Sequence, residues 1–327
     1  MHGGGAAGPW RRQTPDGNPM TLKQLRLLRE IDRQSLNLSA AALTLHTSQP
    51  GVSRQIQQLE RELGAELLLR RTNRILGFTE LGRAVLRSAH RLLDEMENIT
   101  RIAADARDER GGRLTLATSH LHARYTLPEP VRAFSERHPE VQFQLLQADP
   151  DDIQKLVESG DADIGVSTEF AREHPSLVQL PGEALRRSAI MPRGHPLSRR
   201  RRLTLADFAA YPLVSYHPRS RGGQMITEAF TAAGISARHV VSASDSDVIK
   251  AYVAKGLGVA IVPSIAIDPR ADGALHAVDV TRLFPESRMT ISLRHGVHLR
   301  RYLTDFIAMV APRLERAAVA RAMQAGG

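Results

Sequence analysis

The sequence contains no cysteine, which excludes disulfide bonds and thiolate ligands to metals. It also lacks any apolar run of the roughly 18–20 residues that a membrane-spanning helix needs, so no membrane partner is expected. Residues 1–19 are rich in glycine and proline and have no apolar middle of the kind found in signal peptides. We expect these residues to be a disordered extension or a tag, and the protein to be cytoplasmic.

Lysine is scarce, since Lys23, Lys155, Lys250 and Lys255 are the only ones, and arginine supplies the remaining positive charge. The formal net charge is +9, which favours association with polyanions such as nucleic acids. A GC-rich genome also produces arginine-rich proteins, so charge alone does not identify DNA as the partner. Sequence motifs are needed to identify the partner.

Three helices are predicted directly after Met20. Apolar residues at spacings of three and four define the first helix, over Leu22, Leu25, Leu28 and Ile31. A short helix with Ser39 as its N-cap follows. The third helix begins near Ser48, ends at Gly64, and carries an apolar stripe made of Val52, Ile56, Leu59 and Leu63.

The third helix also has a polar face at its N-terminal end, formed by Gln49, Ser53, Arg54 and Gln57. Pro50 is tolerated in the first turn, where its missing N–H has no helical partner. Two short helices joined by a tight turn, with a polar face at the start of the second, indicate a helix-turn-helix. Such a helix places its free N–H groups and short polar side chains in the major groove of DNA. A helical hairpin with an ordinary solvated face is the alternative interpretation.

The segment after this helix favours the DNA interpretation. Two short apolar runs flank a basic stretch at residues 70–74, which predicts a β-hairpin wing. We expect Arg70, Arg71 and Arg74 to contact the DNA backbone. The predicted DNA-binding residues are therefore Ser48, Gln49, Pro50, Ser53, Arg54, Gln57, Arg70, Arg71 and Arg74.

Residues 81–103 form a nearly heptad apolar seam at positions 81, 85, 89, 92, 96, 99 and 103. One long helix cannot bury such a seam alone, so a homodimer is expected, with packing against the helix's own chain as the alternative. Beyond Gly112, strands and helices alternate twice, which predicts two parallel α/β lobes. A ligand would then bind between the lobes, at the carboxyl ends of the strands.

The head, "LNLSAAALTLHTSQPGVSRQIQQLERELGAELLLRRTNRILGFTELG", resembles that of the LysR-type transcriptional regulators. Motifs such as "GDADIGVSTE" and "SASDSDVIKAYVAKGLGVAIV" resemble the subgroup of CysB and Cbl, which control sulfur assimilation. The resemblance implies a winged helix-turn-helix, a long linker helix and a bilobed α/β effector domain like periplasmic binding proteins. Implied partners are double-stranded promoter DNA, a second copy of the chain in a dimer or in a tetramer built as a dimer of dimers, and RNA polymerase.

The chain is accordingly divided into five parts. Residues 1–19 precede the DNA-binding domain at 20–78, and the dimerisation helix covers 79–110. The effector domain covers 112–313, with lobe I at 112–185 plus 286–313 and lobe II at 186–285. Residues 314–327 form a C-terminal tail.

The loops at the strand ends are the predicted effector site. Their hydroxyls and imidazoles suit a small anion or polar metabolite, such as sulfate or an acetylserine, and no cofactor or metal is expected. The predicted residues are Thr118, Ser119, His120, Leu121, His122, Gln147, Thr168, Glu169, Leu185, Ser215 and His217.

This site departs from the pattern of the sulfur regulators. Where they present Thr-x-Thr-Gln, this chain has Ser119-His120-Leu121-His122, and only Ser119 keeps a hydroxyl. Leu185 replaces a tryptophan, and His217 replaces a threonine. His122 and His217 could add hydrogen-bond donors or charge near neutral pH. A related but different effector is therefore expected.

Other functional classes are less well supported. The sequence has no GxSxG, HExxH or P-loop motif, and Lys255-Gly256-Leu257-Gly258 lacks both the third glycine and the preceding strand of a dinucleotide loop. We therefore expect no enzyme activity. A solute-binding protein would explain the two lobes but not the head. The seven arginines between residues 186 and 202 are interpreted as a solvated loop of lobe II rather than a second DNA-binding patch.

Overall fold

The computed structural model describes residues 20–71, 74–107, 110–168 and 174–324. The chain divides into two compact units between Thr100 and Arg101, and each unit is described by itself. We call the first unit the head and the second the effector domain. None of the helices within the described ranges has the length and apolarity required to cross a membrane. The predicted extension at residues 1–19 lies outside the described residues.

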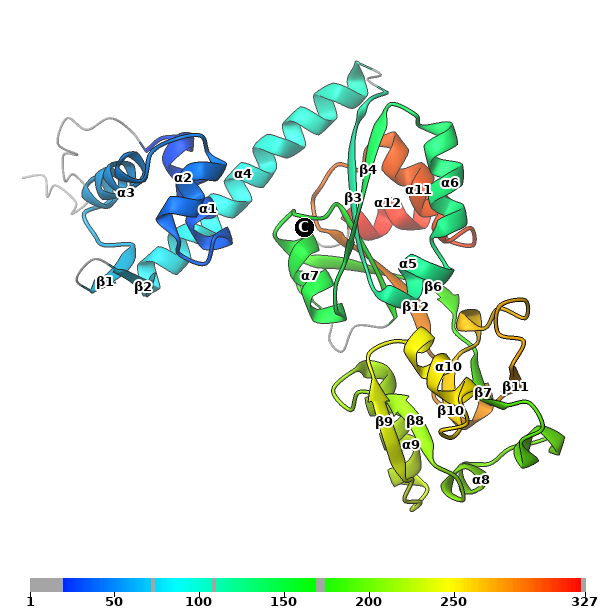
Figure 1. Ribbon diagram of the computed structural model, residues 1–327. Helices are drawn as coiled ribbons and strands as arrows, with labels where there is room; N and C mark the ends of the chain where they lie inside the picture. The colour runs from blue at the N-terminus through cyan, green and yellow to red at the C-terminus, as the bar shows by residue number, and fades with distance from the viewer. Residues whose placement is uncertain (1–19, 72–73, 108–109, 169–173, 325–327) are drawn as a thin grey trace, which may run out of the picture. The chain divides into compact units, whose positions relative to one another are not determined.

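The head is a three-helix cluster followed by a β-hairpin and the first part of a long helix (Figure 1). Its core contains Leu28, Ile31, Val52, Ile56 and Leu59, all at most 1% exposed, so the apolar stripes predicted for the first and third helices meet. The predicted winged helix-turn-helix is confirmed. Its elements are α1 (Leu22–Arg33), α2 (Leu38–Thr44), α3 (Gln49–Leu63), β1 (Leu68–Arg71), β2 (Arg74–Phe78) and α4 (Glu80–Ala106).

The N-cap predicted for the second helix is wrong. Asn37 caps α2, because its Oδ1 accepts hydrogen bonds from the backbone N–H groups of Ser39 (3.0 Å) and Ala40 (3.1 Å). Ser39 is the second residue of the helix. Asparagine and serine are similarly good N-caps, so composition could not choose between two candidates placed two residues apart.

Helix α4 has one side packed on its own unit and one side exposed. Ala89 and Leu93 are 2% exposed and pack against Leu25 of α1. In contrast, Leu92 is 41% exposed and Ile99 is 60% exposed. The predicted seam is therefore divided between packing within the head and an uncovered apolar surface.

Lobe I contains a five-stranded sheet in the order β4-β3-β5-β12-β6. Helix α7 covers one face, with Ile153 and Val157 fully buried, whereas α6, α11 and α12 cover the other (Figure 1). The strands are β3 (Gly112–Thr118), β4 (Val141–Gln147), β5 (Ile164–Thr168), β6 (Leu177–Ala184) and β12 (Arg288–Arg294). The helices are α5 (His120–Tyr125), α6 (Pro128–Arg137), α7 (Pro150–Glu158), α11 (Arg301–Val310) and α12 (Arg316–Gln324).

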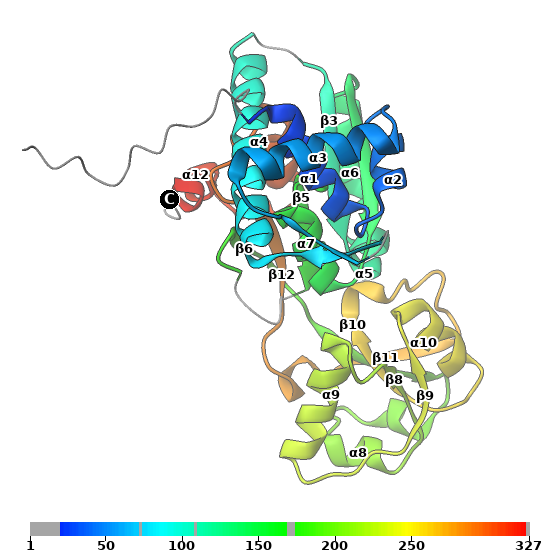
Figure 2. The same ribbon diagram turned by 90° about the vertical axis from the view of Figure 1, so that its left-hand side faces the viewer.

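Lobe II is built on β10-β7-β11 and on the pair β8-β9, with a bridge between Leu213 and Val259 joining the two. Helices α8 and α9 pack on one core cluster and α10 on another (Figure 2). The strands are β7 (Arg187–Pro192), β8 (Leu213–Tyr216), β9 (His239–Ala243), β10 (Ala260–Pro263) and β11 (Leu275–Asp279). The helices are η1 (Pro196–Arg199), α8 (Leu205–Ala209), α9 (Arg221–Ala232), α10 (Ser246–Ala254), η2 (Ser264–Ala266) and η3 (Thr281–Leu283).

The predicted bilobed α/β architecture is confirmed, but its sheets are mixed rather than parallel. Strand β3 pairs in parallel with β4 and β5, and β8 pairs in parallel with β9. Strand β12 runs antiparallel to β5 and β6, and β7 runs antiparallel to β10 and β11. The alternation of strands and helices in the sequence predicts only parallel pairing. It gave no sign of β6, β11 and β12, because none of these strands directly follows an α-helix.

The prediction of a C-terminal tail after residue 313 also needs correction. Helix α12 lies within the predicted tail, and its Val319 is 2% exposed in the core of lobe I. Leu314 and Met323 pack against the same core. Lobe I therefore continues to residue 324 at least.

Gly82, in the first turn of α4, is predicted to be essential for seating this helix on the head. A Cβ atom there would lie 2.0 Å from the carbonyl oxygen of Leu67. Gly82→Ala should therefore lower the free energy of unfolding of the head by about 1–3 kcal/mol, measured by urea denaturation of residues 20–100. Gly77→Ala is the control, because its nearest neighbour is 4.0 Å away. Equal stability of the two variants would contradict this account.

Candidate DNA-binding surface and effector site

The first turn of α3 is held by its N-cap. The Ser48 side chain accepts a hydrogen bond from the N–H of Gly51 at 3.2 Å, and Pro50 occupies the first turn. A Cβ atom on Gly51 would lie 3.1 Å from Ser48 Oγ and 3.3 Å from Thr47 Oγ1, tighter than ordinary contact. A side chain at position 51 would therefore require Ser48 and Thr47 to shift by a few tenths of an ångström.

The predicted polar face of α3 lies on its solvent side. Gln49, Pro50, Arg54 and Gln57 are exposed and Ser53 is half-buried. The Arg54 Nε donates to the carbonyl oxygen of Pro50 at 3.3 Å, which draws the guanidinium toward the helix N-terminus. A helix start with exposed short polar side chains and one arginine can contact base edges and phosphates.

Glu60 fixes the wing to α3. Its carboxylate is buried and accepts hydrogen bonds from the backbone N–H groups of Leu67 (2.9 Å) and Leu68 (3.1 Å). Its second oxygen pairs with the Arg70 guanidinium at 2.8 Å. Glu60 was not predicted as a functional residue, because a glutamate near the end of a helix gives no sign in the sequence that it will be buried.

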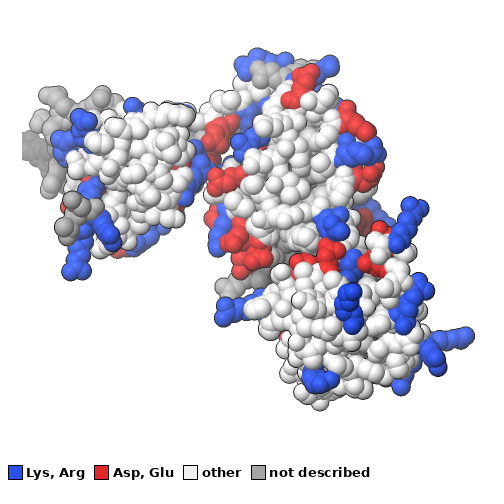
Figure 3. Space-filling model, viewed as in Figure 1, with Lys and Arg blue, Asp and Glu red and all other residues white. Residues whose placement is uncertain are grey.

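The other two predicted wing arginines are more open. Arg71 and Arg74 are exposed and lie opposite one another in the hairpin. Figure 3 shows basic side chains gathered over the part of the head that holds the wing. Residues 72 and 73 of the predicted tip lie outside the described residues.

In lobe I, the structure brings together several predicted effector residues where β3 and β5 end. Thr118 Oγ1 donates to the carbonyl oxygen of Val166 at 2.8 Å, and Thr168 Oγ1 lies 3.1 Å from Nε2 of His122. Ser119 precedes α5, and its Oγ is buried without a hydrogen-bond partner among the described residues. A buried hydroxyl of this kind costs free energy unless another group bonds to it.

His122 is fully buried between two threonines, with Nδ1 3.0 Å from Thr126 Oγ1. Burial lowers the pKa of His122 to about 4. The imidazole is therefore neutral near pH 7, and the expectation that it could add charge to the site is wrong. Its role is to join α5 to the end of β5.

The remaining predicted effector residues are more dispersed. Ser215 is buried on β8, and His217 is exposed after this strand, where its Nδ1 accepts the N–H of Arg219 at 3.2 Å. Leu185 is buried where the chain passes between the lobes, and its N–H donates to Ser287. Gln147 is exposed, Leu121 is half-buried, and Glu169 lies outside the described residues.

Two neighbouring side chains of lobe II were missed. The Tyr216 hydroxyl lies 2.6 Å from Ser246 Oγ, which joins the end of β8 to the start of α10. Burial raises the pKa of the Tyr216 hydroxyl, so it stays protonated, and either hydroxyl can be the donor of this hydrogen bond. The position of Tyr216 directly after the predicted Ser215 was the only available signal.

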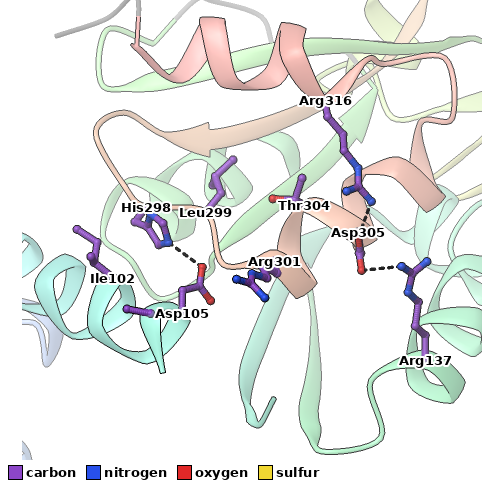
Figure 4. A pocket seen from close by; sticks show the side chains of 10 residues that line it. Ile102, Asp105, Arg137, His298, Leu299, Arg301, Thr304, Asp305 and Arg316 are labelled. Carbon is purple, nitrogen blue, oxygen red and sulfur yellow. Dashed lines mark hydrogen bonds and ion pairs between the residues drawn. The ribbon is translucent and has the colours of Figure 1, made fainter. Parts of the chain in front are cut away.

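The last turn of α4 contacts lobe I beside a pocket of about 630 Å³ (Figure 4). Asp105 accepts from His298 Nε2 at 2.7 Å and pairs with Arg300 at 3.1 Å. Asp305, on another wall of the pocket, pairs with Arg137 and Arg316. Asp105 therefore connects α4 to the segment before α11, and Asp305 connects α11 to α6 and α12.

One side-chain cluster has the spacing of a metal site. His120, Asp245 and Asp247 each place a ligand atom within 4.8 Å of the others. However, Asp247 also pairs with Arg124 at 2.9 Å and lies 3.4 Å from Lys250 Nζ. These two cations would repel a metal ion, so we interpret the cluster as an ion-pair network.

Two family models together match most of the chain. The model described as "LysR substrate binding domain" matches residues 107–315, and "Bacterial regulatory helix-turn-helix protein, lysR family" matches residues 22–83. The chain is 41% identical over 301 residues to the transcriptional regulator SsuR of Burkholderia cenocepacia, covering 92% of this chain and 98% of that protein.

Two solved structures are also similar. The cofactor-binding domain of the Cbl transcriptional regulator is 37% identical with a TM-score of 0.61, covering 65% of this chain and 93% of that one. Full-length CbnR complexed with its target DNA is 26% identical with a TM-score of 0.56, covering 89% and 99%.

The burial of neutral His122 predicts a pH-dependent stability of the effector domain. The pKa of His122 is about 6.5 in the unfolded chain and about 4 in the folded one. At pH values between these two, the unfolded chain therefore binds a proton that the folded chain does not. The free energy of unfolding should therefore be undiminished above pH 6.5 and should fall by up to about 3 kcal/mol as the pH drops toward 4. Urea denaturation of wild type and His122→Gln between pH 4 and 7.5 tests this. An equally steep loss in both proteins would contradict it.

Proposed function

The chain belongs to the LysR family of transcription regulators, and we propose that it binds promoter DNA as a dimer or dimer of dimers under the control of a small polar or anionic metabolite. Membership of this family makes it a DNA-binding regulator with an effector domain rather than an enzyme. We further propose that it acts in the cytoplasm on sulfur assimilation or a related pathway. A LysR-type regulator that responds to a non-sulfur effector is the alternative.

The exposed start of α3 is the observation that carries the DNA-binding proposal. The side chains of α3 that would contact base edges are those of Gln49, Ser53, Arg54 and Gln57. The first turn of this helix, at Ser48 and Pro50, would approach a phosphate group. Arg71 and Arg74 would hold the backbone through the wing. Arg70 would contribute by keeping the wing on α3, since its guanidinium is paired with Glu60 at 2.8 Å.

The uncovered apolar side of α4 supports the proposal of a dimer. Leu81, Leu92 and Ile99 are 44%, 41% and 60% exposed, and the last two are seven residues apart. A second copy of the same helix would bury these side chains. Two heads could then bind two half-sites, with RNA polymerase as a further proposed partner.

The buried hydroxyl of Ser119 supports an effector that carries an acceptor oxygen. Its Oγ has no partner among the described residues, and Ser119 is the residue that keeps the hydroxyl of the sulfur-regulator motif. Sulfate, sulfonates and acetylated serines all supply such an oxygen. His122, whose ring nitrogens face Thr126 and Thr168, would support this loop without adding charge to it.

Substitutions in α3 and the wing should weaken DNA binding in different ways. Arg54→Ala should cost about 1–3 kcal/mol on the preferred sequence and little on random DNA, because a base contact is lost. Arg74→Ala should weaken binding to all sequences and reduce the slope of log K against log salt by about 1. Fluorescence anisotropy at several salt concentrations measures both. Uniform weakening by Arg54→Ala would demote this residue to a backbone contact.

The effector is best sought by thermal shift on residues 101–327, which include the anchored end of α4 and helix α12. The panel would contain sulfate, thiosulfate, acetylated serines and sulfonates, with unrelated carboxylates as controls. A ligand at 100 times its Kd should stabilise the domain by about 2.7 kcal/mol. Ser119→Ala should abolish the shift, whereas Ser135→Ala, on the exposed side of α6, should retain it. A response to a carboxylate alone would remove the sulfur assignment.

A further inference from the structure

One carboxylate of lobe II is contacted by three side chains of lobe I. Asp247, in the first turn of α10, accepts a hydrogen bond from the Tyr125 hydroxyl at 2.5 Å. It lies 3.2 Å from Nε2 of His120 and 2.9 Å from Nε of Arg124. All three lobe I residues belong to α5, which lies at the border with lobe II in both views (Figures 1 and 2).

Lys250 holds the same tyrosine from the lobe II side. Its Nζ donates to the Tyr125 hydroxyl at 3.0 Å, and its charge lies 5.2 Å from the centre of the Tyr125 ring. The ammonium group is itself fixed by the carbonyl oxygen of Ala266 (2.7 Å) and by Asp272 (3.0 Å). The Tyr125 hydroxyl is thus enclosed by two side chains of α10.

These groups are more than a solvated surface pair. The Lys250 side chain is 9% exposed and that of Asp247 is 30% exposed, whereas His120 and Arg124 lie at the solvent edge. Burial raises the pKa of Asp247, but the hydrogen bonds from Tyr125 and His120 and the charges of Lys250 and Arg124 outweigh this, so that its pKa lies below its usual value. Removing one partner from a partly buried network leaves the others unsatisfied, which costs more than losing an exposed pair.

Two segments of the chain connect the lobes. The chain passes from lobe I to lobe II between β6 and β7 and returns between η3 and β12. The two passing segments are joined by the hydrogen bond from Leu185 N–H to Ser287 O at 2.7 Å. Two extended segments side by side can act as a hinge, and contacts across the border then decide the lobe orientation.

We propose that Tyr125, Asp247 and Lys250 form a latch that holds the lobes in one orientation before any effector binds. The latch adjoins the candidate effector site on both lobes. In lobe I, α5 begins directly after Ser119. In lobe II, Asp247 follows Ser246, whose hydroxyl bonds to that of Tyr216 beside Ser215. These three are positioning residues. Contacts formed in only one orientation shift the population toward it. Effector affinity would then depend on the latch, a consequence that rests on the proposed function.

The test measures lobe orientation in the full-length chain without DNA or effector. The sequence has no cysteine, so Ser135→Cys on α6 and Glu228→Cys on α9 give two unique, exposed sites for spin labels, one in each lobe. Double electron–electron resonance, on labelled chain mixed with a large excess of unlabelled chain so that an oligomer carries at most one labelled copy, then reports the distance distribution between the lobes. Asp247→Asn and Tyr125→Phe should each broaden this distribution at least twofold.

Two controls separate the latch from general loss of stability. Glu136→Gln removes an exposed ion pair with Arg132 within lobe I, and Tyr302→Phe removes a tyrosine hydrogen bond to Arg113 within the same lobe. Both should keep the wild-type distribution. If Asp247→Asn and Tyr125→Phe also keep it, even with a lowered melting temperature, the latch is overturned. This outcome leaves the DNA-binding and effector proposals standing, because neither ligand is present.

Discussion

Helix α4 is the element on which the proposed regulation depends, because it contributes side chains to both units. In its first half, Gly82 lies against the backbone of Leu67, and at its middle Leu93 packs in the head. Near its end, Asp105 is held by His298 and Arg300 of lobe I. A continuous helix of 27 residues keeps its backbone hydrogen bonds only if it bends gently.

Within each unit, a buried polar side chain decides how neighbouring elements meet. Glu60 joins the wing to α3, and His122 joins α5 to the end of β5. The contacts of Asp247 and Lys250 with Tyr125 do the same across the lobe border. Apolar packing builds the separate cores, but these polar contacts set the geometry of the surfaces proposed to bind DNA and effector. Each has several partners, so no single hydrogen bond carries the arrangement alone.

Much of the fold could be predicted from the sequence, because its signals are local. The apolar stripe through Val52, Ile56 and Leu59 predicted α3, and the alternation of strands and helices beyond Gly112 predicted two α/β lobes. The antiparallel strand β12 and helix α12 were missed, since their place depends on partners distant in the chain. The same holds for the site. Side-chain type suggested Ser119 and His122. Only the fold shows that the first is buried with no hydrogen-bond partner among the described residues, and that burial lowers the pKa of the second.

The most direct test of the central claim is selection of bound sequences from a pool of random duplex DNA by the full-length chain. The account predicts enrichment of two related half-sites in inverted orientation, separated by about one helical turn or a multiple of it. Their preferred bases should depend on Arg54 and its neighbours on α3. A pool that stays random after repeated selection, with binding that depends on salt alone, would contradict the account.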